Sequence, residues 1–192
     1  MNPKVRSVAS FVEIFTRLTV PGWPPTDSLG VRWAALDGSL DWTSRLNMDL
    51  PPLWKCSRCG RVFANRNQSH FCSRYTLRQH LSGKSWLAIA LFQGFAKLVK
   101  RCGPVRVVPE KTRIAFQVRM SFAAISLRRN RLVGHVVLAR RVENPRFTKI
   151  ESISPRNHVH SFCFSSEDEL DQEVLGWVRE AYRVGQQRHL LK

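Results

Sequence analysis

The chain has 192 residues, enough for one ordinary domain with an appendage or for two small domains, which excludes a large multidomain assembly. Hydrophobic residues make up 43% and aromatic residues 10%, so the chain can bury a core and is not expected to be globally disordered. Its 31 Lys and Arg residues exceed its 14 Asp and Glu residues, giving a formal net charge of +17. Such a surface favours phosphates, nucleic acid or anionic lipid as partners, although charge alone does not choose among them.

The positive charge is concentrated in the middle of the chain. Residues 1–47 carry five basic and four acidic groups, a net charge of +1, so the remaining +16 belongs to residues 48–192. Six of the ten acidic residues in that second part lie between Glu167 and Glu180. We therefore expect a basic central region followed by an acidic final helix.

The sequence favours a cytoplasmic protein without a membrane segment. No stretch approaches the roughly 20 apolar residues of a membrane-spanning helix. The apolar run after Lys4 and Arg6 is interrupted by Glu13, which argues against a secretory signal. Five cysteines, an odd number with three at metal-ligand spacing, are typical of a reducing compartment. The oligomeric state is left open by the sequence.

Residues 1–47 are expected to form a poorly ordered extension. Residues 5–18 have apolar side chains at helical intervals, but residues 21–47 are broken by Pro and Gly and carry three Trp without a period. Two origins are open. The extension is either a start-site artefact, with the functional chain beginning near Met48, or a genuine N-terminal docking segment.

Patterning is strong after Met48 and predicts a domain of helices and strands over residues 83–188. A broad apolar stripe from Trp86 to Val99 predicts a largely buried helix that starts at Ser82 or Ser85. Strand-like segments follow at residues 105–108, 112–119, 121–127, 132–139, 147–153 and 158–164. The final helix is predicted to start at the capping box Ser166-Glu167-Asp168-Glu169 and to end near Gly185.

The strand pattern predicts a sheet with one face on the core and one in water. In the second segment Ile114 and Phe116 alternate with Arg113, Gln117 and Arg119, and the latter three are expected to face solvent. Short connections such as residues 128–131 favour antiparallel hairpins. The order helix, antiparallel β-meander, helix predicts a two-layer α+β fold with both helices on the apolar face of the sheet.

A Cys-rich unit over residues 50–82 has the ligand spacing of a zinc knuckle or ribbon-like unit. Cys56 and Cys59 are separated by two residues, and His70 and Cys72 lie at i and i+2, where they share a face of an extended segment. Three thiolates and one imidazole complete a closed tetrahedral site, which predicts structural Zn²⁺. The second pair is spaced more tightly than usual, so His80 remains an alternative fourth ligand.

A redox pair is the competing interpretation of the two closely spaced cysteines. Such pairs normally open a helix in a βαβ context, which this sequence lacks. Ordinary buried thiols, with His70 at the surface, remain the other alternative.

Four segments resemble bacterial proteins of the domain of unknown function 5655 family. The segments are Leu53 to Cys72, Lys111 to Phe116, Arg119 to Ala123 and Pro155 to His160. The resemblance covers roughly residues 50–188. It implies a Cys-rich lead-in followed by a small α+β domain, and it implies no established activity and no catalytic residue.

Several basic residues of the strand region are candidates for anion binding because Arg offers a planar fork that suits phosphates. The candidates are Lys111, Arg113, Arg119, Arg156, His158 and His160. A solvated basic face without a partner is the alternative for the arginines. His158 and His160 are open to three interpretations: a second metal site, a proton-transfer pair, or packing under a helix.

Three functions follow from these patterns. The leading one is a zinc-binding module that binds a polyanion, most plausibly nucleic acid, through the knuckle and the basic sheet. The second is a binding protein or enzyme for a small anion or phosphate ligand in a Lys/Arg/His pocket, although no nucleophile motif or phosphate loop supports a particular reaction. The third is a protein-protein adaptor that docks a partner through the acidic final helix.

Overall fold

The computed structural model describes residues 50–190, so the expectations for residues 1–47 lie outside the described residues. The α+β class is confirmed. After a small two-stranded sheet, the short helix α2 (Leu77–Leu81) precedes the long helix α3 (Trp86–Lys100). Six strands follow: β3 (Arg106–Pro109), β4 (Ile114–Gln117), β5 (Ser121–Leu127), β6 (Leu132–Leu138), β7 (Phe147–Ser154) and β8 (Asn157–Phe164). The chain then forms the 3₁₀ turn η2 (Glu167–Glu169), helix α4 (Gln172–Gly185) and the 3₁₀ turn η3 (Arg188–Leu190).

The six strands form one antiparallel sheet in the order β3-β4-β5-β6-β8-β7. The sequence predicts a meander, and this order is followed from β3 to β6. The last hairpin is inverted, because β8 pairs with β6 over seven residue pairs while β7 forms the edge. The edge position suits β7, since most of its side chains are exposed, whereas β8 alternates between buried and half-buried residues.

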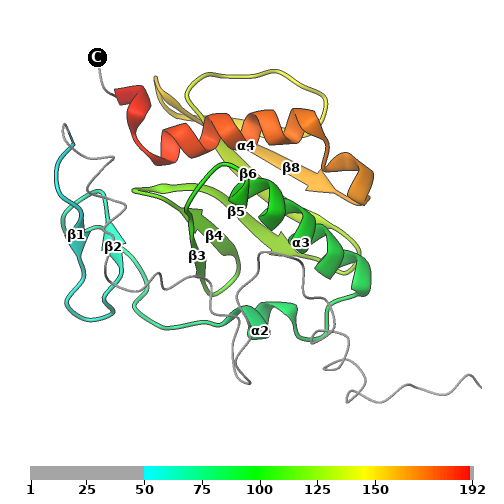
Figure 1. Cartoon of the computed structure of the whole chain (residues 1–192), viewed down its shortest axis with the longest axis horizontal. Helices are drawn as coiled ribbons and strands as arrows, with labels where there is room; N and C mark the ends of the chain where they lie inside the picture. Colours follow the sequence, from blue (N-terminus) through cyan, green and yellow to red (C-terminus); the bar gives the residue numbers. More distant parts are fainter. Residues whose placement is uncertain (1–49, 191–192) are drawn as a thin grey trace, which may run out of the picture. The chain divides into compact units, whose positions relative to one another are not determined.

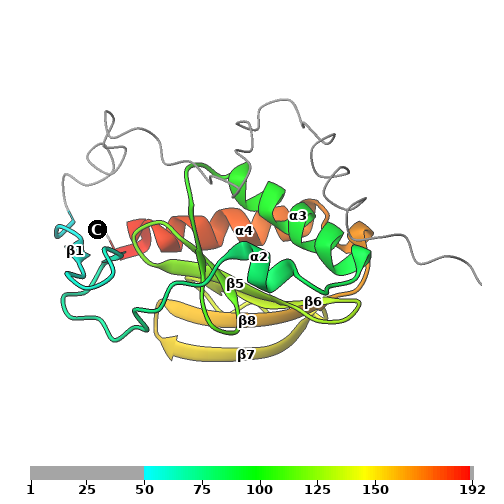
Figure 2. The ribbon, with the colours of Figure 1, turned by 90° about the horizontal axis from the view of Figure 1, so that it is seen from below.

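Helices α3 and α4 lie next to each other and both contact strands β5 and β6 (Figure 1). Figure 2 shows both helices on one side of the sheet, which confirms the predicted two layers. The layers meet through aromatic rings: Phe95 of α3 has its ring centroid 5.6 Å from that of Phe116 and 5.5 Å from that of Phe162. On α4, Trp177 packs against Phe147 at 4.3 Å.

The start of α3 agrees with the sequence, but its first residue does not face the core. Ser85 is the N-cap, and its side chain accepts a hydrogen bond from the backbone N–H of Ala88. The predicted apolar stripe includes Trp86, and this indole is 71% exposed. Periodicity places Trp86 on the stripe, but it does not show which positions of the stripe other parts of the protein cover.

The start of α4 was predicted wrongly. The capping box at Ser166 is present, but it caps η2, and the chain leaves helical geometry at Leu170 with φ −87° and ψ 56°. The helix proper begins at a second cap, Asp171, whose carboxylate accepts from the N–H of Val174 at 3.0 Å. Arg146 stabilises this break because its guanidinium donates to the carbonyl oxygen of Glu169 and to the carboxylate of Asp171.

The expected solvent-facing residues at the end of β4 are buried. Gln117 is 4% and Arg119 is 3% exposed, although both alternate with apolar residues. The Gln117 side chain donates to the carbonyl of Val62 in the Cys-rich unit at 2.9 Å, and Arg119 donates to the carbonyl of Pro51. The period of two therefore located the strand correctly. The polar side chains at its end contact the Cys-rich unit, which is distant in sequence, and so they do not face solvent.

No helix within residues 50–190 is long and apolar enough to cross a membrane.

Two glycines give a paired test of the packing. A Cβ atom at Gly134 in β6 would lie 2.6 Å from the carbonyl oxygen of Ala124 and 2.8 Å from Ile125 Cγ2, whereas a Cβ at Gly176 in α4 would meet nothing within 4 Å. We expect Gly134→Ala to lower the free energy of unfolding by about 1–3 kcal/mol because the backbone of β5 must move. Gly176→Ala is expected to raise it by about 0.5–1 kcal/mol.

Urea unfolding followed by circular dichroism measures both changes. Equal effects of the two substitutions would contradict the described packing of β5 against β6.

Candidate metal centre

The Cys-rich unit is built on a tight turn between two very short strands. β1 (Trp54–Lys55) pairs antiparallel with β2 (Val62–Phe63). Between them, the N–H of Cys56 donates to the carbonyl of Arg61 at 2.8 Å, and the N–H of Gly60 donates to the carbonyl of Cys56 at 2.9 Å. Gly60 has φ +72°, a conformation that suits glycine. This turn brings the thiols of Cys56 and Cys59 to one side.

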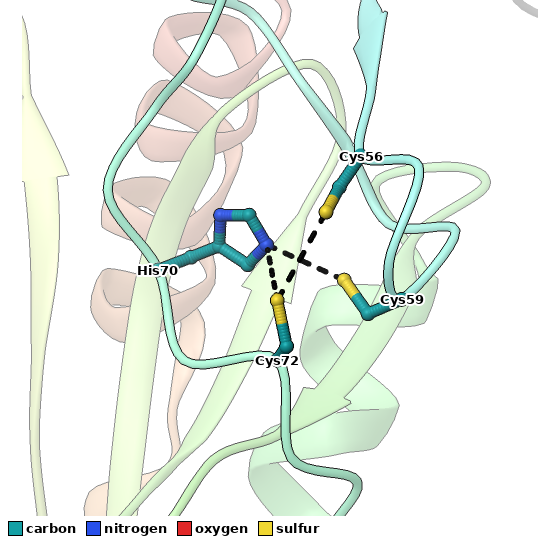
Figure 3. A group of neighbouring side chains, drawn as sticks. All are labelled: Cys56, Cys59, His70 and Cys72. Carbon is teal, nitrogen blue, oxygen red and sulfur yellow. Dashed lines mark hydrogen bonds between the residues drawn. The ribbon is translucent and has the colours of Figure 1, made fainter.

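The segment that follows β2 returns His70 and Cys72 to the same point (Figure 3). His70 Nε2 lies 3.3 Å from Cys59 Sγ and 3.3 Å from Cys72 Sγ. The sulfur atoms of Cys56 and Cys72 are 4.0 Å apart. All four ligand atoms lie within 4.8 Å of one another, so this group could hold a metal ion.

The separations match the edges of a tetrahedron around one ion. Zn–S bonds of about 2.3 Å and Zn–N bonds of about 2.0–2.1 Å imply sulfur–sulfur edges of about 3.8 Å and sulfur–nitrogen edges of about 3.6 Å. The observed 4.0 Å and 3.3 Å are close to those values. Three of the six edges of such a tetrahedron are therefore near the expected lengths, and all four ligand atoms lie within 4.8 Å of one another.

The imidazole of His70 is held in the orientation that a metal ligand needs. Its Nδ1 lies 2.7 Å from the carbonyl oxygen of Gln68, so Nδ1 carries the proton and donates it. Nε2 then presents a lone pair to the cluster. Phe63 packs against the ring at 4.4 Å, and Trp54 meets it edge-on at 6.0 Å. These two aromatic side chains support the ligand.

The backbone of the turn favours thiolates. The N–H of Arg61 lowers the pKa of Cys59 to about 6, and the Arg61 side chain acts in the same direction. The N–H of Cys59 lowers the pKa of Cys56. Burial raises the pKa of Cys72. The turn at Gly60 therefore places backbone N–H groups where they stabilise the thiolate forms of Cys56 and Cys59.

His80 does not belong to the cluster. It lies on α2, where its Nε2 is 2.6 Å from the carbonyl oxygen of Glu110. Its contact fastens α2 to the turn between β3 and β4. The structure therefore brings His70, and not His80, to the three cysteines.

The anion-binding candidates lie at two ends of the sheet. Lys111 and Arg113 are in the turn before β4, and Arg113 is paired with Glu110 at 2.6 Å. Arg119 follows β4 at its other end, where it is buried and bonded to the side chain of Gln187 at 2.9 Å. Arg156 precedes β8 and donates to the carbonyl of His189. These residues do not line one common pocket.

The two histidines of β8 have protein partners. His160 is fully buried; its Nδ1 contacts the carbonyl of His158 at 3.0 Å, and its Nε2 accepts from the N–H of Val142 at 2.9 Å. Burial lowers the pKa of His160, which keeps the ring neutral. His158 Nδ1 contacts the hydroxyl of Ser152 at 2.8 Å. Of the three sequence interpretations, this geometry supports packing for His160.

The sequence also contains a local charge imbalance: residues 50–109 contain eleven Lys or Arg residues and no Asp or Glu. On the Cys-rich unit, exposed basic side chains are contributed by Lys55, Arg58, Arg66 and Arg74. Phe71 stands between two cluster residues and is 67% exposed. A count of acidic residues along the sequence identifies this segment, because it is a long stretch with basic residues and no acidic ones.

The family comparison covers the domain that follows the Cys-rich unit. Residues 78–185, from α2 to the end of α4, match the family described as "Domain of unknown function (DUF5655)". The chain belongs to this family. The resemblance seen in the sequence is thereby confirmed, and the Cys/His cluster lies in the lead-in before the DUF5655 match. No curated protein and no solved structure matches the chain with significance.

Substitutions within the cluster and substitutions outside it should differ in their effect on bound metal. Cys59→Ser and His70→Ala remove one ligand each, so we expect purified protein to lose at least half of one equivalent of bound metal. His80→Ala and Cys102→Ser change residues outside the cluster and are expected to keep the full equivalent. Elemental analysis of the purified variants measures this.

The prediction fails if His80→Ala loses metal while His70→Ala retains it, because His80 would then be the fourth ligand.

Proposed function

We propose that this protein is a zinc-stabilised module that binds nucleic acid through the basic surface of its Cys-rich unit. In this proposal residues 50–82 form the zinc knuckle and residues 83–188 form the α+β domain that carries it. Residues 1–47 take no part in the proposal.

The proposal of zinc rests on the chemistry of the ligands. Three thiolates and one imidazole in tetrahedral positions are a set that suits Zn²⁺, whereas Mg²⁺ and Ca²⁺ prefer oxygen ligands. Four protein ligands leave no open position for water or substrate, so the ion would act in folding and not in catalysis. Thiolate ligands also require reduced cysteine, which supports a cytoplasmic protein.

The proposal of nucleic acid rests on one observation above all: the surface around the cluster is basic and has no acidic side chain of its own. Arg58, Arg66 and Arg74 are exposed and make no ion pair within the described residues. Guanidinium groups that keep their charge unpaired can contact phosphates.

Phe71 supplies a second element of recognition. Its neighbours in sequence, His70 and Cys72, both belong to the cluster, so a bound ion would fix the backbone on either side of an exposed ring. A rigid exposed aromatic side chain beside arginines is suited to stacking on a base. Trp54 and Phe63, two other aromatic side chains of this unit, pack against His70.

A salt series tests this function. We expect the affinity for a labelled nucleic acid strand to fall steeply between about 50 and 200 mM salt. The triple variant Arg58→Ser, Arg66→Ser and Arg74→Ser should reduce the slope of log K against log salt by up to about 2, because each lost phosphate contact contributes about 0.7 on a single strand.

A charge-matched control is available in Arg101→Ser, Arg179→Ser and Arg183→Ser, which removes three exposed arginines from α4 and the end of α3. This control should leave the slope unchanged. An unmodified protein that shows no salt-dependent binding would refute the proposed function.

A further inference from the structure

A second basic surface lies at the opposite end of the sheet from the contact between Gln117 and Val62 of the Cys-rich unit. The turn between β3 and β4 and the turn between β5 and β6 meet at this end, because Ile114 pairs with Ile125. The first turn of α3 joins them. We name this surface the Trp86 rim and define it by six residues: Lys84, Trp86, Lys111, Arg128, Arg129 and Arg131.

Hydrogen bonds fix these three segments to one another. The Ser85 hydroxyl, at the N-cap of α3, donates to the carbonyl of Arg129. The hydroxyl of Ser126 in β5 donates to the carbonyl of Thr112 at 2.8 Å. The segments that carry the indole and the basic side chains are therefore held together at one end of the sheet.

Within residues 50–190, Trp86 contributes little to the hydrophobic core. The indole is 71% exposed, whereas the other aromatic residues of α3, Phe92 and Phe95, are 3% and 0% exposed. Helix capping at this end is performed by Ser85. An exposed indole leaves a large flat surface in water, which a stacked base would cover.

The charges of the rim are not neutralised within the protein. Lys111, Arg128, Arg129 and Arg131 are exposed, and none of them forms an ion pair within residues 50–190. Other arginines of the sheet region are paired with carboxylates: Arg113, in the same turn as Lys111, pairs with Glu110, and Arg146 pairs with Asp171 and Glu173. The acidic turn η2 follows β8 at the same end of the sheet.

We propose that the Trp86 rim is a second binding surface for single-stranded nucleic acid, in which an unpaired base stacks on Trp86 and the neighbouring phosphates contact Arg128, Arg129 and Arg131. The exposed indole favours a single strand, since bases in a duplex already stack on each other. This inference rests on the proposed function, because it needs nucleic acid as the ligand. It adds a surface that the Cys-rich unit does not contain.

The two surfaces are separate contacts. The Cys-rich unit touches Gln117, which pairs with Ser121 at the start of β5, whereas the rim lies beyond Leu127 at its end. The seven residues of β5 span about 20 Å at 3.3 Å per residue. A strand that reaches both surfaces binds more tightly than one that reaches either alone.

Fluorescence anisotropy with full-length protein tests the rim. The probes are labelled oligothymidylate and oligouridylate of about 20 nucleotides, longer than the 4–16 nucleotides of many single-strand sites. We expect Trp86→Ala to weaken binding by about 5-fold to 100-fold without changing the salt slope. The triple variant Arg128→Ser, Arg129→Ser and Arg131→Ser should lower the slope by up to about 2.

The same triple substitution at Arg101, Arg179 and Arg183 is the charge-matched control and should leave the slope unchanged. Ile153→Ala, which removes another side chain that is 71% exposed, is the matched control for Trp86. Comparison of the two oligonucleotides distinguishes DNA from RNA as the source of the strand.

Three outcomes would overturn the inference. If Phe71→Ala weakens binding and Trp86→Ala does not, the proposed function stands and the rim is refuted. If the triple variant of the rim, the triple variant of the Cys-rich unit and the charge-matched control all lower the salt slope equally, binding follows net charge and has no site at the rim. If Trp86→Ala reduces binding to phosphatidylserine vesicles while neither oligonucleotide binds the unmodified protein, the rim is a lipid surface and the proposed function fails as well.

Discussion

The convergence of three thiols and one imidazole on a single point is the constraint on which the Cys-rich unit depends. Between residues 50 and 76 only Cys56 and Phe63 are buried, and each strand has two residues. A hairpin of this size is at best marginally stable in water. Binding of zinc to knuckle-sized peptides contributes about 10–16 kcal/mol, which far exceeds what two buried side chains provide. An ion in the cluster would therefore determine whether this unit has a structure.

The same constraint extends into the DUF5655 domain. Gln117 and Arg119 are polar residues that are almost fully buried, and both are bonded to backbone carbonyls of the Cys-rich unit. A buried guanidinium is costly without its hydrogen bonds. The DUF5655 domain and the Cys-rich unit therefore share an interface. In it, side-chain donors of the domain are hydrogen-bonded to backbone carbonyls of the unit.

Local patterns predicted most of this structure. Strands β5 and β6 and the cap of α3 at Ser85 follow from alternation and capping preferences, which act over a few residues. The four residues that converge in the Cys/His cluster could be picked out from their spacing, because that spacing reflects the reach of a turn around one point. Errors arose where distant segments decide the outcome: the burial of Arg119 depends on Pro51, and the break before α4 depends on Arg146. Exposure of Trp86 could not be predicted either, since periodicity does not show which positions of a stripe other parts of the protein cover.

X-ray absorption spectroscopy at the zinc edge, on protein purified without added metal, measures the ligands of the proposed ion. A zinc ion held by Cys56, Cys59, His70 and Cys72 should have a first shell of three sulfur atoms at about 2.3 Å and one nitrogen atom at about 2.0–2.1 Å. A shell made of oxygen and nitrogen atoms alone, or the absence of zinc from protein with an ordered Cys-rich unit, would contradict this proposal.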